Sequence, residues 1–139
     1  MLIEDTEQNA RAERRLREDL VVWLTTVRRD GQPQSTPVWF VWDGDHEVLI
    51  YSIPNQQKLR NLAANPRISL HFNDRDGDDV VALEGEARID EGASPPNEVE
   101  AYTEKYRKPI ANLGYDPEGF GEQYSAAIRV RITRARAPF

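Results

Sequence analysis

The spacing of apolar residues divides the chain into strands and helices. Six segments are rich in branched and aromatic residues, and in "RISLHF" and "AAIRVRIT" the apolar residues alternate with polar ones, as in a half-buried strand. In three other segments the apolar residues recur at three- and four-residue spacing, which predicts helices. The predicted strands are residues 20–27, 33–42, 47–53, 67–72, 80–89 and 124–133, and the predicted helices are 6–19, 55–65 and 97–110.

Turn and cap residues set the limits of these elements. Asp30-Gly31 and the segment "DGDH" separate the first three strands, and Pro54 ends the third. Thr6 and Asn97 are predicted to cap the first and last helices. The polar segment "DRDGDD" is predicted to be a turn, Gly85 to interrupt the fifth strand, and the glycine-rich segment 111–123 to be a loop.

Strands that follow one another through short turns favour an antiparallel arrangement. The pattern therefore predicts a mainly β fold with flanking helices, a barrel or sheet of six antiparallel strands. The length of 139 residues suits a single domain over residues 1–139, with the N-terminal helix inside residues 1–19.

Composition excludes several classes of protein. The formal net charge of −6 repels nucleic-acid phosphates, so no nucleic-acid partner is expected. No apolar run is long enough to cross a bilayer, and the charged N-terminus does not resemble a signal peptide, so a cytoplasmic protein is expected. The chain has no cysteine and its two histidines lack a ligand pattern, so no metal site is predicted.

A basic pair stands out in the segment "YSIPNQQKLRNLAANPRISL". Ser52, Gln56, Gln57 and Lys58 precede "LRNL" at the start of a short helix, whose first N–H groups and dipole can hold a phosphate, and Arg60 could add a bidentate contact. The alternative is that Lys58 and Arg60 form the solvated face of that helix. The residues alone leave both readings open.

The strand at 33–42 carries a second candidate feature. Pro37 cannot donate to a β-ladder, so it belongs at an edge or bulge, where the backbone of Thr36 and Val38 is free to face a ligand. An ordinary edge-strand proline is the alternative. Trp39, beside this position, is the tryptophan we expect to line a pocket.

The order of these parts resembles a known family. The segments "QSTPVW", "KLRNLAANPR" and "VALEGEARI" are similar, between about Leu20 and Ile132, to the split-barrel flavin and deazaflavin reductases related to pyridoxamine 5'-phosphate oxidase. In that family a strand with a Thr-Pro-hydrophobic pattern lies along the tricyclic ring, and a lysine in the second segment contacts the cofactor phosphate. The resemblance implies a split β-barrel and these cofactor-binding residues: Gln34, Ser35, Thr36, Pro37, Val38, Trp39, Tyr51, Ser52, Gln57, Lys58, Arg60 and Asn61.

The same resemblance implies a function. It indicates an oxidoreductase that uses coenzyme F420, with FMN as the alternative cofactor, and that reduces a small conjugated organic substrate as a homodimer with its sites between subunits. The acidic tail of F420 is a possible ligand of Arg60, Arg129 or Arg131. No catalytic side chain is identified. Two other readings stay open: a non-catalytic cofactor carrier, and a dimeric barrel that binds nothing at this place.

Overall fold

A computed structural model describes residues 7–74 and 76–136, and all structural statements refer to these residues. They form one curled sheet of seven strands in which every neighbouring pair is antiparallel, in the order β2-β1-β5-β6-β7-β4-β3. The mainly β split-barrel prediction is confirmed. The strands are β1 Val22–Val27, β2 Pro33–Val38, β3 Phe40–Trp42, β4 Glu47–Ser52, β5 Arg67–Phe72, β6 Ala82–Ile89 and β7 Ala126–Arg136.

The sheet has seven strands rather than six because the predicted strand 33–42 is broken at Trp39. Its first part, β2, pairs with β1 at one edge of the sheet. Its second part, β3, pairs with β4 at the opposite edge. A single stretch of chain therefore connects the two edges, and Trp39 lies at the crossing.

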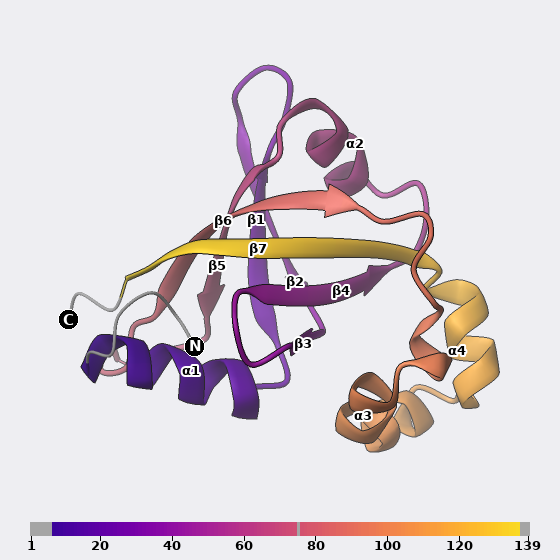
Figure 1. Cartoon of the computed structure of the whole chain (residues 1–139). Coiled ribbons are helices and arrows are strands. Elements are labelled where there is room, and N and C mark those ends of the chain that lie inside the picture. Colours follow the sequence, from indigo (N-terminus) through magenta and orange to yellow (C-terminus); the bar gives the residue numbers. More distant parts are fainter. Residues whose placement is uncertain (1–6, 75, 137–139) are drawn as a thin grey trace.

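In the described part of the chain, four α-helices surround the sheet: α1 Glu7–Glu18, α2 Gln57–Ala64, α3 Glu100–Asn112 and α4 Pro117–Gln123, with a 3₁₀ turn η1 at Pro96–Glu98. In Figure 1, α1 and α2 lie on opposite sides of the curled sheet, and α3 and α4 lie together beyond β4. None of the helices in the described ranges is long and apolar enough to cross a membrane.

The prediction of one helix cap and the prediction of the glycine-rich loop both need correction. Asn97 does not cap α3, because it belongs to η1, and Val99 precedes α3 without a side-chain cap bond. The glycine-rich segment is not all loop, since its second half forms α4. The Asp116 side chain caps α4 by accepting from the Gly119 N–H, and Pro117 occupies its first turn. The predicted cap Thr6 of the first helix lies outside the described residues.

Two apolar cores stabilise the fold. The first fills the inside of the barrel with the alternating residues of the strands and with Ala12 and Leu16 of α1. The second is aromatic and lies on the outer face of β4, where Leu49 and Tyr51 pack against Tyr102, Tyr106 and Ile110 of α3 and Phe120 of α4. This second core holds the helices that flank Trp39.

Candidate functional site

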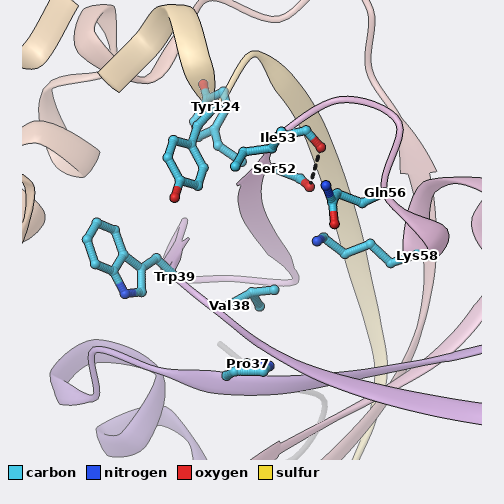
Figure 2. Close-up of a pocket in the computed structure, with 9 residues that line it drawn as sticks. Pro37, Val38, Trp39, Ser52, Ile53, Gln56, Lys58 and Tyr124 are labelled. Carbon is cyan, nitrogen blue, oxygen red and sulfur yellow. Dashed lines mark hydrogen bonds between the residues drawn. The ribbon is translucent and has the colours of Figure 1, made fainter. Parts of the chain in front are cut away.

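A hollow of about 270 Å³ lies where the β2–β3 crossing meets the end of β4 and the start of α2. Figure 2 shows Trp39 and Lys58 on opposite sides of this hollow. We call it the Trp39 hollow; its lining residues are Pro37, Val38, Trp39, Tyr51, Ser52, Ile53, Gln56, Lys58 and Tyr124.

A second hollow of about 180 Å³ adjoins it, because Gln56 and Lys58 line both. We call it the Gln34 hollow; its lining residues are Thr26, Gln34, Ser35, Thr36, Gln56, Gln57, Lys58 and Asn61. Each hollow is smaller than a typical small-molecule site of roughly 300–1,000 Å³, so a ligand of coenzyme size would have to extend through both.

A tight turn places Lys58 between the two hollows. After β4 the chain reverses at Asn55, whose φ of 66° lies in the left-handed region that asparagine tolerates. The guanidinium of Arg60 donates to the Asn55 carbonyl at 2.9 Å and to the Gln57 Oε1 at 2.8 Å. Arg60 therefore fastens the turn to the first turn of α2 and lines neither hollow.

Lys58 has the electrostatic properties of an anion ligand. Its side chain is half-buried, and burial lowers the pKa of its ammonium below the ordinary value. No hydrogen bond or ion pair holds this ammonium within the described part of the chain. The first backbone N–H groups of α2 point toward the N-terminal end of the helix, where Lys58 lies. The cap residue Gln56 makes no side-chain hydrogen bond to them. A partly desolvated cation beside open helix N–H groups favours binding of a phosphate.

The Gln34 hollow is ordered by amide side chains. Buried Asn61 donates to Thr26 Oγ1 at 2.9 Å and to Gln34 Oε1 at 3.0 Å, and its own Oδ1 accepts from Gln57 Nε2 at 2.8 Å. All strong hydrogen-bonding positions of Asn61 except one lone pair are thus used within the protein. Asn61 holds α2 against β1 and β2, while Ser35 and Thr36 line the hollow beside it.

An aromatic stack supports the other wall. The Trp39 ring lies parallel to Tyr106, with centroids 4.8 Å apart and planes 4° apart, and it also stacks on Phe120 at 5.7 Å. Phe120 stacks in turn on Tyr124 at 4.3 Å. Because α3 and α4 hold this stack, the position of Trp39 depends on the second core.

Pro37 lies on β2, the edge strand of the sheet, as predicted. It is exposed, and it pairs in register with Trp23 of β1. The backbone groups of an edge strand that point away from the sheet have no strand partner, so this margin of the Trp39 hollow can contact a ligand through the main chain.

Eleven of the twelve residues expected to bind a cofactor line one of the two hollows, and Arg60 is the exception. Gln56, which the sequence placed with the phosphate-binding residues, lines both hollows, whereas Thr26, Ile53 and Tyr124 were not predicted. The sequence pattern places Tyr124 in the last strand, but β7 begins only at Ala126 and Tyr124 is the C-cap residue of α4. No local pattern distinguishes such a residue, because it approaches Trp39 only through the packing of α4.

The other arginines suggested for an acidic tail lie elsewhere. Arg129 bonds to Asp90 at 2.7 Å and to Glu47 at 2.8 Å, and these carboxylates raise the pKa of its guanidinium. Arg129 and Arg131 line a separate hollow on β4, β6 and β7 that shares no residue with the Trp39 hollow. Within residues 7–74 and 76–136, no three histidine or acidic side chains gather in a group that could hold a metal ion.

Comparisons with known proteins agree with this architecture. The family model described as "Pyridoxamine 5'-phosphate oxidase" matches residues 8–137. A solved structure described as an F420 reductase is 27% identical, with a TM-score of 0.70, over 90% of this chain and 95% of that chain. A conserved hypothetical protein from Mycobacterium tuberculosis is 26% identical, with a TM-score of 0.71, over 96% of this chain and 84% of that one.

The fold also occurs in proteins of another description. The heme-storage protein HutZ from Vibrio cholerae is 13% identical, with a TM-score of 0.64, over 95% of this chain and 95% of that chain. At this identity the similarity concerns the fold alone.

Proposed function

The chain belongs to the pyridoxamine 5'-phosphate oxidase family, and from this premise we propose that it is an oxidoreductase that binds a flavin or deazaflavin coenzyme across the Trp39 and Gln34 hollows. One observation supports this proposal above the others. The half-buried ammonium of Lys58 lines both hollows and has no counter-ion in the described part of the chain.

The residues present suit such a coenzyme. In the proposal Lys58 and the first N–H groups of α2 hold the phosphate, as an ammonium and a helix terminus do for anions. The tricyclic ring lies along residues 36–39, where Trp39 offers a flat face and the edge strand offers main-chain groups. When bound, the coenzyme would supply the hydride chemistry.

The chain's own contribution is binding, orientation and exclusion of water. Asn61 and Arg60 keep α2 and its turn in place, and thus position Lys58. Trp39, backed by Tyr106 and Phe120, gives the hollow a rigid apolar wall. No acid–base side chain is assigned, since hydride transfer from a coenzyme does not require one from the protein.

Within this class we favour coenzyme F420 over FMN, and reduction of a small conjugated organic substrate over other reactions. The 27% identity to an F420 reductase, over nearly the whole length of both chains, supports this order. Of the arginines considered for the acidic F420 tail, Arg60 is the one that lies in sequence between two residues of the hollows, Lys58 and Asn61. Arg129 is already paired with two carboxylates.

We also propose that the protein acts as a homodimer with its sites between subunits. Ile53 supports this, because it lines the Trp39 hollow and yet keeps 38% of its surface exposed. A partner subunit would cover this apolar rim. Light scattering coupled to size-exclusion chromatography tests the assembly: a dimer is expected at micromolar concentration, and a monomer that binds coenzyme fully would contradict the shared site.

The decisive experiment identifies the coenzyme. The protein is expressed in a host that makes both flavins and F420, and the small molecules released on denaturation are examined by absorbance and mass. F420 is the expected result; FMN alone would reverse our order, and neither would argue against the proposed site. Titration of both coenzymes into protein freed of small molecules, followed by tryptophan fluorescence, gives the two affinities.

A second experiment separates an enzyme from a carrier. The protein is mixed anaerobically with the reduced coenzyme and a panel of quinones and enones. An oxidoreductase reoxidises the coenzyme only when a suitable substrate is present. A carrier shows tight binding and no substrate-dependent reoxidation with any member of the panel.

A further inference from the structure

A separate groove of about 450 Å³ lies between α1, β3 and α3. We call it the Lys105 groove; its lining residues are Leu16, Arg17, Val41, Trp42, Ala101, Glu104 and Lys105. It shares no lining residue with the Trp39 or Gln34 hollow. Nothing in the proposed redox function uses its two cations.

The Lys105 amine has an unusual environment. Its Nζ donates a hydrogen bond of 2.9 Å to the Phe40 carbonyl and lies 3.7 Å from the centroid of the Phe40 ring. It also lies 5.4 Å from the centroid of the Tyr106 ring. In the described part of the chain no carboxylate oxygen lies within ion-pair distance of Nζ. Its partners are therefore a main-chain oxygen and aromatic faces.

Burial lowers the pKa of Lys105 to about 8, and the charge of Asp19 opposes this change. The other charged groups at the groove are Arg17 on α1 and Glu104 on α3. At pH 7.5 an amine with such a pKa is neutral about a quarter of the time, whereas an ordinary lysine with a pKa of ~10.4 is neutral about once in a thousand. The neutral amine is the nucleophilic form.

Arg17 supplies an anion contact in the same groove. Its side chain is exposed, and its guanidinium lies 4.8 Å from the centroid of the Trp42 ring, also a lining residue. Among the described residues it has no ion pair. A guanidinium that lies over an aromatic ring and has no carboxylate partner can still donate to a phosphate.

We propose that Lys105 is a site of Nε-acylation by acyl phosphates, with Arg17 holding the phosphate of the reagent. The neutral amine attacks the carbonyl carbon, a C–N bond forms, and the C–O bond to phosphate breaks. The products are an Nε-acyl lysine and inorganic phosphate, and the proton lost by the nitrogen passes to phosphate or water. The step requires no oxidant or reductant.

The modification has a structural consequence. It removes the positive charge that lies against the Phe40 ring and carbonyl, and Phe40 is the first residue after the Trp39 crossing. Phe40 therefore connects the Lys105 groove to Trp39, which forms a wall of the Trp39 hollow.

The small number of lysines makes a direct test possible. The chain contains three, Lys58, Lys105 and Lys108, and Lys108 is exposed on the same helix as Lys105. Folded protein is treated with acetyl phosphate between pH 6.5 and 9.5, and acetylation of each lysine is followed with time by mass spectrometry of proteolytic peptides. At pH 7.5 Lys105 is expected to react about tenfold faster than the exposed Lys108, because more of its amine is neutral, although a lower pKa also lowers the nucleophilicity of that amine. Its rate is expected to level off above pH 8 to 9.

Two results would overturn the proposal. One is a Lys105 rate equal to or below that of Lys108 at pH 7.5. The other is a Lys105 rate that still rises tenfold per pH unit at pH 9.5. Either result shows that the amine is not selectively activated in the folded chain.

The role of Arg17 is tested by changing the reagent. Arg17→Gln is expected to slow acetylation of Lys105 by acetyl phosphate several-fold, and to leave acetylation by the uncharged acetic anhydride unchanged. Arg107→Gln, an exposed change on α3 outside the groove, is the matched control and is expected to alter neither rate. Equal rates of Arg17→Gln and wild type with acetyl phosphate would remove Arg17 from the proposal.

Discussion

Tyr102 and Tyr106 lie one turn apart on α3 with ring centroids 4.8 Å apart, and of their two hydroxyls only that of Tyr106 has hydrogen-bond partners among the described residues. The Tyr106 hydroxyl accepts from the Phe40 N–H at 2.8 Å and lies 2.8 Å from the Leu20 carbonyl. The Tyr102 hydroxyl is buried and has no hydrogen-bond partner within residues 7–74 and 76–136. Burial raises the pKa of both phenols above the ordinary value.

Tyr102→Phe is expected to leave the free energy of unfolding unchanged or to raise it by up to about 1 kcal/mol, because it removes a buried hydroxyl that makes no bond. Tyr106→Phe is the matched change on the same helix, and it is expected to lower the free energy of unfolding by about 1–3 kcal/mol, since the Phe40 N–H loses its acceptor. Urea unfolding measures both. Equal losses in the two variants would show that the Tyr102 hydroxyl has a partner in solution.

Lys58→Ala is expected to weaken coenzyme binding by about 10- to 100-fold, the effect of losing one charge-assisted hydrogen bond to a phosphate. Turnover at saturating coenzyme changes much less, because the contact is the same in the ground and transition states. Lys108→Ala, on an exposed site away from both hollows, controls for the loss of charge. Unchanged coenzyme affinity in Lys58→Ala would remove the phosphate assignment.

Gly85→Ala is expected to lower the free energy of unfolding by about 1–3 kcal/mol or more. A Cβ at this position would lie 2.5 Å from the Arg131 carbonyl oxygen of β7, a main-chain atom that cannot move aside without opening the ladder. The residue belongs to the irregularity in register between Glu84 and Gly85. Gly92→Ala is the control, because its nearest neighbour is the Asp90 carboxylate at 3.7 Å. Thermal unfolding of the two variants measures the difference.

The stability of the wild type relative to Lys105→Met is expected to increase between pH 7.5 and 9.5. Burial lowers the pKa of Lys105 to about 8 in the folded protein, so over this range the unfolded chain binds more protons at this site than the folded one. Free energy of unfolding then rises with pH. The methionine variant lacks this titration and shows only the pH dependence of the remaining groups. Parallel curves for the two proteins would mean that the folded pKa of Lys105 is near the ordinary value. The pH range ends below the pKa of tyrosine in the unfolded chain, because ionisation of those tyrosines would lower the free energy of unfolding.

The periodicity of the sequence predicted the strands well but not where one of them changes partner. Val38 and Phe40 are both buried and Trp39 between them is only part-buried, so the alternation of a single strand continues through the break. What changes at Trp39 is the neighbouring strand, from β1 to β4, and alternation of side chains carries no information about that.

The missed helix α4 has a different cause. Gly119 and Gly121 lower the helix propensity of the segment, although Asp116, Pro117 and Glu118 form a cap and a first turn. A Cβ on Gly121 would come within 2.1 Å of the Asn97 Oδ1, so this glycine permits close packing of α4 on η1. Tertiary contact, rather than propensity, explains this helix, and Tyr124 reaches the Trp39 hollow because of it.

The candidate site was easier to predict than the contacts that organise it. A lysine in the first turn of a short helix and a proline in a strand are local signals, and the fold brings both to one place. The roles of Arg60 and Asn61 could not be predicted, because each depends on how the chain folds back. Arg60 bonds to the Asn55 carbonyl across a tight turn, and Asn61 bonds to Thr26 and Gln34, which are distant in the sequence.

The crossing at Trp39 also determines how the barrel can open. Residues 33–42 contain both edge strands of the sheet, β2 and β3. Local unfolding of this segment would therefore separate both edges from their neighbours and remove one wall of the Trp39 hollow at the same time. A molecule bound in this hollow would therefore slow amide hydrogen exchange more in β2 and β3 than in β5 and β6, which lie in the middle of the sheet.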